Sequence, residues 1–295
     1  MPFTRRDLLK TSTLTALALA TRTLHANPLG LPLGIQLYSV RDYLPKDYLG
    51  TLKQLSALGY QEVEAAGFYN HSAAEVKDAM QQTNLRLVSS HYSANTLYPQ
   101  TDQIIDFAHQ LGLQYIVCSF PAIKNPSRLA DTSYQGVRKA FLTEDWHYNA
   151  EQFNLIGEKV KAAGMKFAYH NHTIEFRLTD GIVPFDELMR LTDPDKVSFE
   201  VDCGWVTVGG GNPEEILHKY GKRIHMLHLK DFKSFASTDT NTAVPTEMGR
   251  GIVENYKILA AAKAADIQHV FVEQEGFDVP WVESLRIDAE WLRKA

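Results

Sequence analysis

The sequence predicts an α/β fold, a single (β/α)8 TIM barrel. From about residue 33 onward, short apolar runs rich in β-branched and aromatic residues alternate with amphipathic stretches of helical period. Eight such pairs fill about 270 residues, close to the roughly 250 residues of an ordinary barrel of this kind. The alternative is a doubly wound sheet, but no Gly-x-Gly-x-x-Gly follows a predicted strand, so a dinucleotide-binding fold has no support.

The predicted strands are the short apolar runs. In chain order they are 33–39 (LGIQLYS), 61–66 (QEVEAA), 85–90 (LRLVSS), 114–119 (QYIVCS), 165–171 (MKFAYHN), 197–202 (VSFEVD), 224–230 (IHMLHLK) and 269–274 (HVFVEQ). The predicted helices lie between them, where apolar residues recur with helical spacing. They are residues 46–58, 72–83, 100–111, 146–163, 184–191, 213–220, 252–265 and 280–293. Several helices end in a glycine just before the next strand, the usual residue for a left-handed helix stop: Gly59, Gly112 and Gly164.

Two of the predicted connections are long. Residues 120–145 follow the fourth strand and residues 231–249 follow the seventh, so both lie on the face where barrel enzymes place their sites. Long loops at that face are usually lids or specificity elements. The glycines 209–211 follow the sixth strand without the Lys-Ser/Thr of a phosphate-binding loop, which predicts a flexible connection. No linker rich in Pro, Gly or Ser divides residues 27–295, so one barrel domain is expected there.

Residues 1–26 have the features of an export signal. A basic start with Arg5 and Arg6 precedes an apolar run of Ala, Leu and Thr, and Ala26 is a small residue at a plausible cleavage point. The Arg-Arg pair followed by Asp-Leu-Leu-Lys resembles a twin-arginine signal, with an ordinary secretory signal or an uncleaved anchor as alternatives. We therefore expect recognition by the twin-arginine export machinery and a periplasmic or other extracytoplasmic location.

Composition and charge exclude several classes of protein. The 295 residues are 44% hydrophobic and 22% charged, with a net charge of −5, which is typical of a globular chain. Residues 1–26 carry four basic residues and one acidic residue, so the remaining 269 residues have a net charge of −8. This acidity disfavours nucleic-acid binding, and no later segment has the 18 or so unbroken apolar residues of a membrane span. Cys118 and Cys203 are expected as two buried single thiols, with a disulfide between them left open.

Ionisable residues gather at the carboxyl ends of the predicted strands, which meet at one mouth of a barrel. They are Glu62, Glu64, His91, His170, His172, Glu175, Glu200, Asp202, His228, Lys230, Asp231, Glu273 and Glu275. Converging carboxylates repel one another unless a cation lies among them, so this pattern predicts a metal site. Asp, Glu and His ligands without Cys fit one divalent ion, with Mn²⁺, Mg²⁺, Co²⁺ and Zn²⁺ left open. Asp202, His228 and Glu273 lie on three successive strands and are the strongest candidates.

Five segments at these strand ends have a familiar order and spacing: 34–39, 169–172, 200–202, 227–231 and 272–274. Together they resemble the xylose isomerase-like TIM barrels, the sugar phosphate isomerase/epimerase superfamily, over essentially all of residues 27–295. That superfamily also contains tagatose epimerases, inosose dehydratases and endonuclease IV enzymes.

The resemblance implies a ligand set for one divalent metal. Epimerases of this family use a Glu, an Asp, a His and a Glu on strands five to eight, which implies Asp202, His228 and Glu273 here. The strand-five Glu is absent, and His170 stands at or near its position. His170 is therefore the expected fourth ligand, with His172 or Glu175 as alternatives.

The resemblance also implies a carbohydrate substrate and abstraction of a proton next to a sugar carbonyl, with the metal stabilising the enediolate. In the epimerases both ligand glutamates move protons, so His170 puts a symmetric two-base epimerisation in doubt. Isomerisation and β-elimination by a keto-glycoside lyase or dehydratase need one base and stay open. Glu273 or His172 is the expected base, and Lys230 and His91 are expected to orient or protonate the oxygen atoms.

Other side chains are candidates for substrate binding. Trp205, Tyr38 and Phe68 are expected either to stack on the sugar or to pack beneath the loops, and Trp205 replaces the histidine of the family's Asp-x-x-His. Glu64 is a further candidate, and ion pairs to neighbouring lysines or arginines are the alternative role for both Glu62 and Glu64. Two other functions remain as competitors: a non-catalytic periplasmic sugar-binding barrel, and a metal-dependent phosphoesterase or endonuclease, which the charge of −8 disfavours. Paired barrels are common in the family, so a homodimer is left open.

Overall fold

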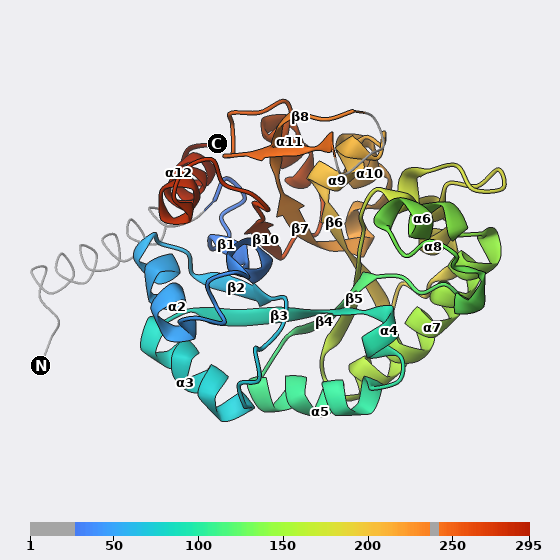
Figure 1. The fold of residues 1–295 in the computed structure, drawn as a ribbon, viewed down its shortest axis with the longest axis horizontal. Coiled ribbons are helices and arrows are strands. Elements are labelled where there is room, and N and C mark those ends of the chain that lie inside the picture. Colours follow the sequence, from blue (N-terminus) through green and yellow to red (C-terminus); the bar gives the residue numbers. More distant parts are fainter. Residues whose placement is uncertain (1–26, 237–241) are drawn as a thin grey trace, which may run out of the picture.

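Eight parallel strands close into a barrel in the computed structural model, which describes residues 27–236 and 242–295 (Figure 1). Around the barrel the strand order is β1-β10-β7-β6-β5-β4-β3-β2. These strands are β1 (Gly34–Gln36), β2 (Glu62–Ala65), β3 (Arg86–Ser93), β4 (Tyr115–Phe120), β5 (Lys166–His170), β6 (Val197–Asp202), β7 (Ile224–Leu229) and β10 (His269–Val272). The predicted (β/α)8 barrel is confirmed, whereas the predicted export signal, residues 1–26, lies outside the described residues.

The main helices form an outer ring around the strands (Figure 1). They are α2 (Tyr48–Ala57), α3 (Ala73–Thr83), α5 (Thr101–Leu111), α7 (Thr143–Ala162), α8 (Pro184–Leu191), α10 (Pro213–Tyr220), α11 (Asn255–Ala262) and α12 (Trp281–Lys294). Local chemistry fixes many of their ends. A capping box of Ser72 and Glu75 starts α3, and Pro184 and Pro213 occupy the first turns of α8 and α10. The predicted glycine stops have the expected positive φ angles, 92°, 77° and 81° at Gly59, Gly112 and Gly164. Within the described residues, none of the helices is long and apolar enough to cross a membrane.

Several short elements were not predicted. The first predicted strand stops at Gln36, because the side chain of Gln36 accepts a hydrogen bond from the Tyr38 amide and turns residues 37–40 into a 3-10 helix. The long connections are also partly ordered. The first contains α6 (Tyr134–Ala140), and the second forms the antiparallel pair β8 (Asp231–Ser234) and β9 (Val244–Thr246). Two further short helices, α4 (Ala94–Leu97) and α9 (Cys203–Val208), follow β3 and β6 directly.

The barrel interior is layered. A small apolar cluster joins strands from opposite sides of the barrel and consists of Val88, Tyr115, Val117, Ala168, Met226 and Phe271. Because side chains alternate along a strand, the residues two positions further along β5, β7 and β10 face the same interior. Those residues are His170, His228 and Glu273, so this apolar layer supports the polar groups at the carboxyl mouth.

The opposite mouth has its own polar network. Glu62 forms ion pairs with Arg86 and, at 2.7 Å between Oε2 and Nδ1, with His269. Tyr115 donates a hydrogen bond of 2.7 Å to the side-chain oxygen of Gln268 nearby. The prediction that Glu62 lies at the same mouth as Glu64 is therefore wrong: both face inward, but Glu62 lies at the amino end of β2 and contacts the first residues of β3 and β10.

Candidate active site

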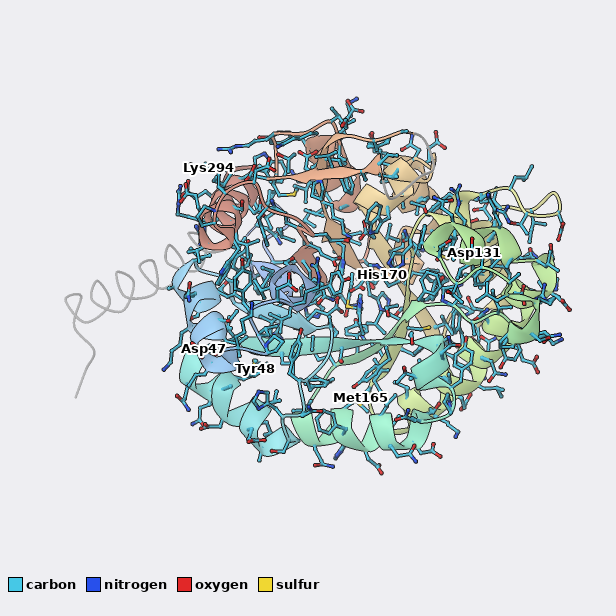
Figure 2. All side chains as sticks on the ribbon, viewed as in Figure 1. Asp47, Tyr48, Asp131, Met165, His170 and Lys294 are labelled. Atoms are coloured by element: carbon cyan, nitrogen blue, oxygen red, sulfur yellow. The ribbon has the colours of Figure 1, made fainter. Side chains whose placement is uncertain are left out.

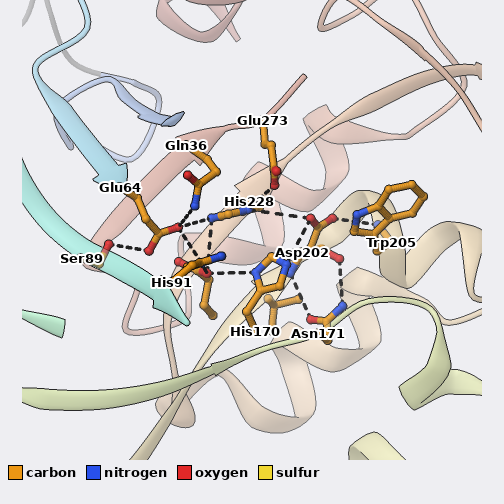
Figure 3. Close-up of polar contacts among 12 residues, drawn as sticks. Gln36, Glu64, Ser89, His91, His170, Asn171, Asp202, Trp205, His228 and Glu273 are labelled. Carbon is orange, nitrogen blue, oxygen red and sulfur yellow. Dashed lines mark hydrogen bonds and ion pairs between the residues drawn. The ribbon is translucent and has the colours of Figure 1, made fainter. Parts of the chain in front are cut away.

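The polar residues at the carboxyl ends of the strands converge inside the barrel mouth. Figure 2 shows His170 near the centre of the ring of strands. In the close-up, side chains from the strands and strand ends point toward one another (Figure 3). They are Gln36, Glu64, Ser89, His91, His170, Asp202, His228 and Glu273.

Four predicted ligands form one compact group: His170, Asp202, His228 and Glu273. All four are buried, and one ligand atom of each lies within 4.8 Å of the others. His228 Nδ1 is 2.8 Å from Glu273 Oε2 and 3.8 Å from Asp202 Oδ2. His170 Nε2 is 3.9 Å from Asp202 Oδ2. Two imidazoles and two carboxylates fit a divalent ion, so these four residues, here called the upper group, could hold one.

Lys230 follows β7 directly and contacts the carboxylates of the upper group. Its Nζ lies 3.0 Å from Asp202 Oδ2 and 3.1 Å from Glu273 Oε2, and it also forms an ion pair with Glu275. Burial alone would raise the pKa of Glu273, but Lys230 and His228 outweigh burial and hold it below its ordinary value. For Asp202 the effect of burial exceeds the opposing effect of Lys230 and His228, so its pKa lies above the ordinary value. Both carboxylates are ionised at neutral pH, and Glu273 is the one whose ionised form is stabilised more strongly.

A second set of charges lies beside the upper group. Glu64 Oε1 is 2.9 Å from His91 Nε2 and 2.7 Å from His228 Nε2. Glu200 Oε2 is 2.7 Å from His91 Nε2 and 2.9 Å from His170 Nδ1. Burial would lower the pKa of His91, but Glu64 and Glu200 outweigh burial and raise it to about 10. His91 is thus an imidazolium held by two carboxylates at neutral pH.

These contacts create a second candidate cation group that overlaps the first. His91, His170, Glu200 and His228 also offer ligand atoms within 4.8 Å of one another. His170 and His228 belong to both groups, but they face them with opposite nitrogens. His170 presents Nδ1 to Glu200 and Nε2 to Asp202, while His228 presents Nε2 to Glu200 and Nδ1 to Asp202.

A cavity of about 490 Å³ opens above these groups. Its lining includes the predicted site residues Tyr38, His91, His170, His172 and Glu273. Side chains from the ends of β3 and β4 form the opposite wall, so the cavity extends well beyond the upper group. The volume suits a small organic ligand.

The other predicted contacts do not line this cavity. Glu64 is fully buried beneath it and accepts hydrogen bonds from Gln36 and Ser89. Phe68 packs edge-on against Phe107, with ring centroids 5.0 Å apart. The Trp205 ring lies against Lys230, with its centre 4.6 Å from the Lys230 ammonium. The roles of Glu64, Phe68 and Trp205 in substrate binding stay predictions.

Residues 52–295 match the family described as Xylose isomerase-like TIM barrel. The chain belongs to the xylose isomerase-like TIM barrel family. This membership confirms the family that the strand-end segments indicated, and it agrees with the closed eight-stranded barrel.

Relatives of this xylose isomerase-like barrel include proteins named as an inosose dehydratase and as a sugar phosphate isomerase/epimerase. The chain is 29% identical over 190 residues to the inosose dehydratase of Clostridium botulinum (strain Alaska E43 / Type E3), covering 62% of each chain. The match thus spans less than two thirds of that relative. The solved sugar phosphate isomerase/epimerase from Parabacteroides distasonis ATCC 8503 is 25% identical, with a TM-score of 0.72 over 89% of this chain and 93% of that one. A xylose isomerase-like TIM barrel protein from Mycobacterium smegmatis, solved in complex with magnesium, is 13% identical, with a TM-score of 0.62 over 90% of this chain and 96% of that one.

Asn171, which follows β5 directly, was not predicted as a site residue, yet it positions the end of β6. Its Oδ1 accepts a hydrogen bond from the Asp202 amide at 3.1 Å, and its Nδ2 donates to the Asp202 carbonyl at 3.3 Å. Asp202 ends β6 and caps α9, because its Oδ1 accepts a hydrogen bond of 2.8 Å from the Trp205 amide. Glu200, one of the predicted strand-end residues, lies two residues before Asp202 on the same face of β6 and contacts His91 and His170.

Buried acids also hold the loops of the mouth. Asp231 accepts backbone hydrogen bonds of 2.9–3.0 Å from residues 232, 249, 251 and 253, so it fixes the chain that returns from β9. Glu175 accepts from the Tyr169 hydroxyl and from the His172 amide, and burial raises its pKa to about 7. Glu175 and His172, the alternative fourth ligands, are in neither candidate cation group of the described residues.

The two cysteines are both free and buried, at Cys118 in β4 and Cys203 at the start of α9. The expectation of two buried single thiols is confirmed. Burial raises the pKa of both thiols, which keeps them protonated and poor as metal ligands at neutral pH.

Proposed function

We propose that this protein is a divalent-metal-dependent enzyme that removes a proton from the carbon next to the carbonyl of a carbohydrate. The observation that carries the proposal is the upper group of two histidines and two carboxylates, buried beside a cavity of about 490 Å³. The names of its relatives, a dehydratase and a sugar phosphate isomerase/epimerase, support a carbohydrate substrate. The relative solved with magnesium supports a divalent ion, while the two imidazoles leave Mn²⁺, Co²⁺ and Zn²⁺ as alternatives.

The metal would be held by His170, Asp202, His228 and Glu273, and when bound it supplies a Lewis acid that polarises the carbonyl. Glu273 is the proposed base, because it stays ionised and lines the cavity. His172 is the alternative base: it lines the cavity, and burial lowers its pKa to about 3, so it is neutral but a weak proton acceptor.

Two cations can act on the substrate oxygens. His91 lines the cavity as an imidazolium and can donate a hydrogen bond to an oxygen that gains negative charge. Lys230 supplies a second positive charge behind the carboxylates of the upper group. One base and two cations suit isomerisation or β-elimination, whereas His170 in place of the family's strand-five glutamate gives no support to a symmetric pair of bases.

The reaction is tested by incubating the metal-loaded protein in D₂O with a panel of keto-sugars and keto-glycosides. Deuterium entering the substrate carbon without loss of a group would indicate isomerisation or epimerisation. An ultraviolet-absorbing enone would indicate elimination. Metal binding without either signal would contradict the proposal and favour a non-catalytic sugar-binding barrel.

The two overlapping cation groups are separated by matched variants. We expect one divalent ion per chain in the purified protein, measured by inductively coupled plasma mass spectrometry. Asp202→Asn should lower metal affinity by more than about tenfold, because it removes a charged ligand of the upper group alone. Glu200→Gln should keep the ion, because Glu200 belongs only to the second group. The reverse result, loss in Glu200→Gln and retention in Asp202→Asn, would place the ion among His91, His170, Glu200 and His228.

We also propose that residues 1–26 direct export by the twin-arginine route to the periplasm or another extracytoplasmic space. The proposal rests on Arg5 and Arg6 before a weakly apolar run. The paired substitution of lysine at both positions should leave the precursor in the cytoplasm, as measured by fractionation and immunoblotting. Unchanged export of this variant would contradict the twin-arginine assignment.

A further inference from the structure

Lys230 contacts the same two carboxylates that the proposed function assigns to the metal. Its Nζ is 3.0 Å from Asp202 Oδ2 and 3.1 Å from Glu273 Oε2, and these oxygens also face His228 Nδ1 at 3.8 and 2.8 Å. An ammonium and a divalent cation at adjacent positions on shared carboxylates repel each other, and burial leaves little water to screen them. Lys230 is only 3% exposed.

The lysine is held in this place by three neighbours. Its ammonium lies 4.6 Å from the centre of the Trp205 ring, a cation–π contact. Its backbone carbonyl accepts a hydrogen bond of 3.0 Å from Asn255 Nδ2. At Gly204, an added Cβ would lie 2.7 Å from the Cβ of Lys230, so only glycine leaves room for the stem of the lysine. The backbone and stem of Lys230 are therefore fixed, so the position of its ammonium depends on Trp205 and on the surrounding carboxylates.

Glu275 is the third carboxylate on Lys230 and differs from the other two. It forms an ion pair with Lys230, yet it belongs to neither candidate cation group. Its side chain is 27% exposed, whereas Asp202 and Glu273 are buried. Glu275 thus attracts the ammonium toward the cavity rim and away from the proposed ligands.

We propose that Lys230 is an internal competitor of the metal and that Glu275 is a positioning residue that draws Lys230 away from Asp202 and Glu273. This inference rests on the proposed metal site. Before the ion binds, Lys230 offsets the repulsion between the two carboxylates and keeps the ligands close together. When the ion binds, Glu275 and Trp205 keep the ammonium beside the site, where its charge remains available to the substrate oxygens.

The test measures Mn²⁺ affinity of the metal-stripped full chain by isothermal titration calorimetry at pH 8, where protons compete little for carboxylates. Lys230→Met should tighten Mn²⁺ binding at least about tenfold, because it removes a positive charge that faces the same carboxylates as the ion with little water between them. Lys230→Arg keeps the charge and should leave the affinity close to that of the wild type. Glu275→Gln should weaken binding about tenfold, and this effect should vanish in the Lys230→Met background because Glu275 acts through Lys230.

The results of these Mn²⁺ titrations distinguish the role of Lys230, the role of Glu275 and the metal site itself. Unchanged or weaker binding in Lys230→Met, with normal binding in the wild type, would overturn the inference alone. An undiminished Glu275→Gln effect in the Lys230→Met background would overturn the positioning role. Absence of Mn²⁺ binding in every form, repeated with Co²⁺ and Zn²⁺, would overturn the proposed metal site and the inference with it. Thermal unfolding of each variant identifies any that fail to fold. Comparing the Mn²⁺ affinities of Lys230→Arg and Lys230→Met then distinguishes the effect of the charge from the effect of side-chain packing.

Discussion

Replacing Glu273 by glutamine should slow deuterium exchange at the substrate carbon by about 10²–10⁴-fold, the usual contribution of a general base. The substitution keeps the shape of the side chain but removes the group that Lys230 and His228 hold ionised. It also weakens one proposed metal ligand, so exchange is measured at saturating metal and the metal content of the same sample is determined. A large loss of exchange with metal retained identifies Glu273 as the base.

Two variants make this result interpretable. His172→Gln removes the alternative base, and a greater loss than in Glu273→Gln would transfer the role of base to His172. Glu62→Gln removes a buried carboxylate at the opposite mouth, where its partners are Arg86 and His269. Exchange by the folded Glu62→Gln protein should equal that of the wild type, because no atom of Glu62 contacts the upper group.

The sequence was sufficient for the barrel because strands and helices alternate with a simple periodicity. It was sufficient for three members of the upper group because the ends of parallel strands meet, whereas His170 as the fourth was implied by the family resemblance. Parallel strands end at a common mouth, so residues at the carboxyl ends of β6, β7 and β10 had to meet. Asp202, His228 and Glu273 were predicted on that ground, and the structure brings them together with His170.

The position of Glu62 along its strand was misjudged. Glu62 and Glu64 are two residues apart on the same face of β2, so alternation treats them alike, yet they belong to opposite mouths. The predicted bounds of this strand, 61–66, agree with β2 to within one residue, so Glu62 could have been assigned to the amino end of the strand. The unpredicted helix α9 has a different cause: Asp202 caps it through the Trp205 amide, a tertiary arrangement at a strand end that helical periodicity does not show.

The set of charges around Glu64 explains a second large effect, on stability rather than rate. Glu64→Gln should lower the free energy of unfolding of the metal-free protein by about 3–5 kcal/mol, the usual cost of removing one partner of a buried ion pair. The shape is retained, because the Ser89 hydroxyl that donates to Glu64 can also accept from the new amide. The loss is therefore electrostatic, because the positive charges of His91 and His228 are only partly compensated by the carboxylates that remain. Urea unfolding at pH 7 measures it, with the exposed Glu151→Gln as a control expected to change stability by less than about 0.5 kcal/mol.

The pH dependence of the same unfolding free energy gives an independent check. The folded protein raises the pKa of His91 to about 10 from an ordinary value near 6.5, so it binds more protons than the unfolded chain between these values. The contribution of His91 is therefore complete below about pH 6.5 and is lost as the pH rises through 10. The pKa of Glu64 is lowered in the folded protein, where His91 and His228 together outweigh the opposing effect of burial, so its contribution is present above the ordinary carboxylate pKa and is lost in acid.

In Glu64→Gln the loss of stability on the alkaline side should begin at lower pH, because His91 keeps only Glu200 as a close partner. An unchanged alkaline limb would show that the charge of Glu64 does not set the protonation of His91.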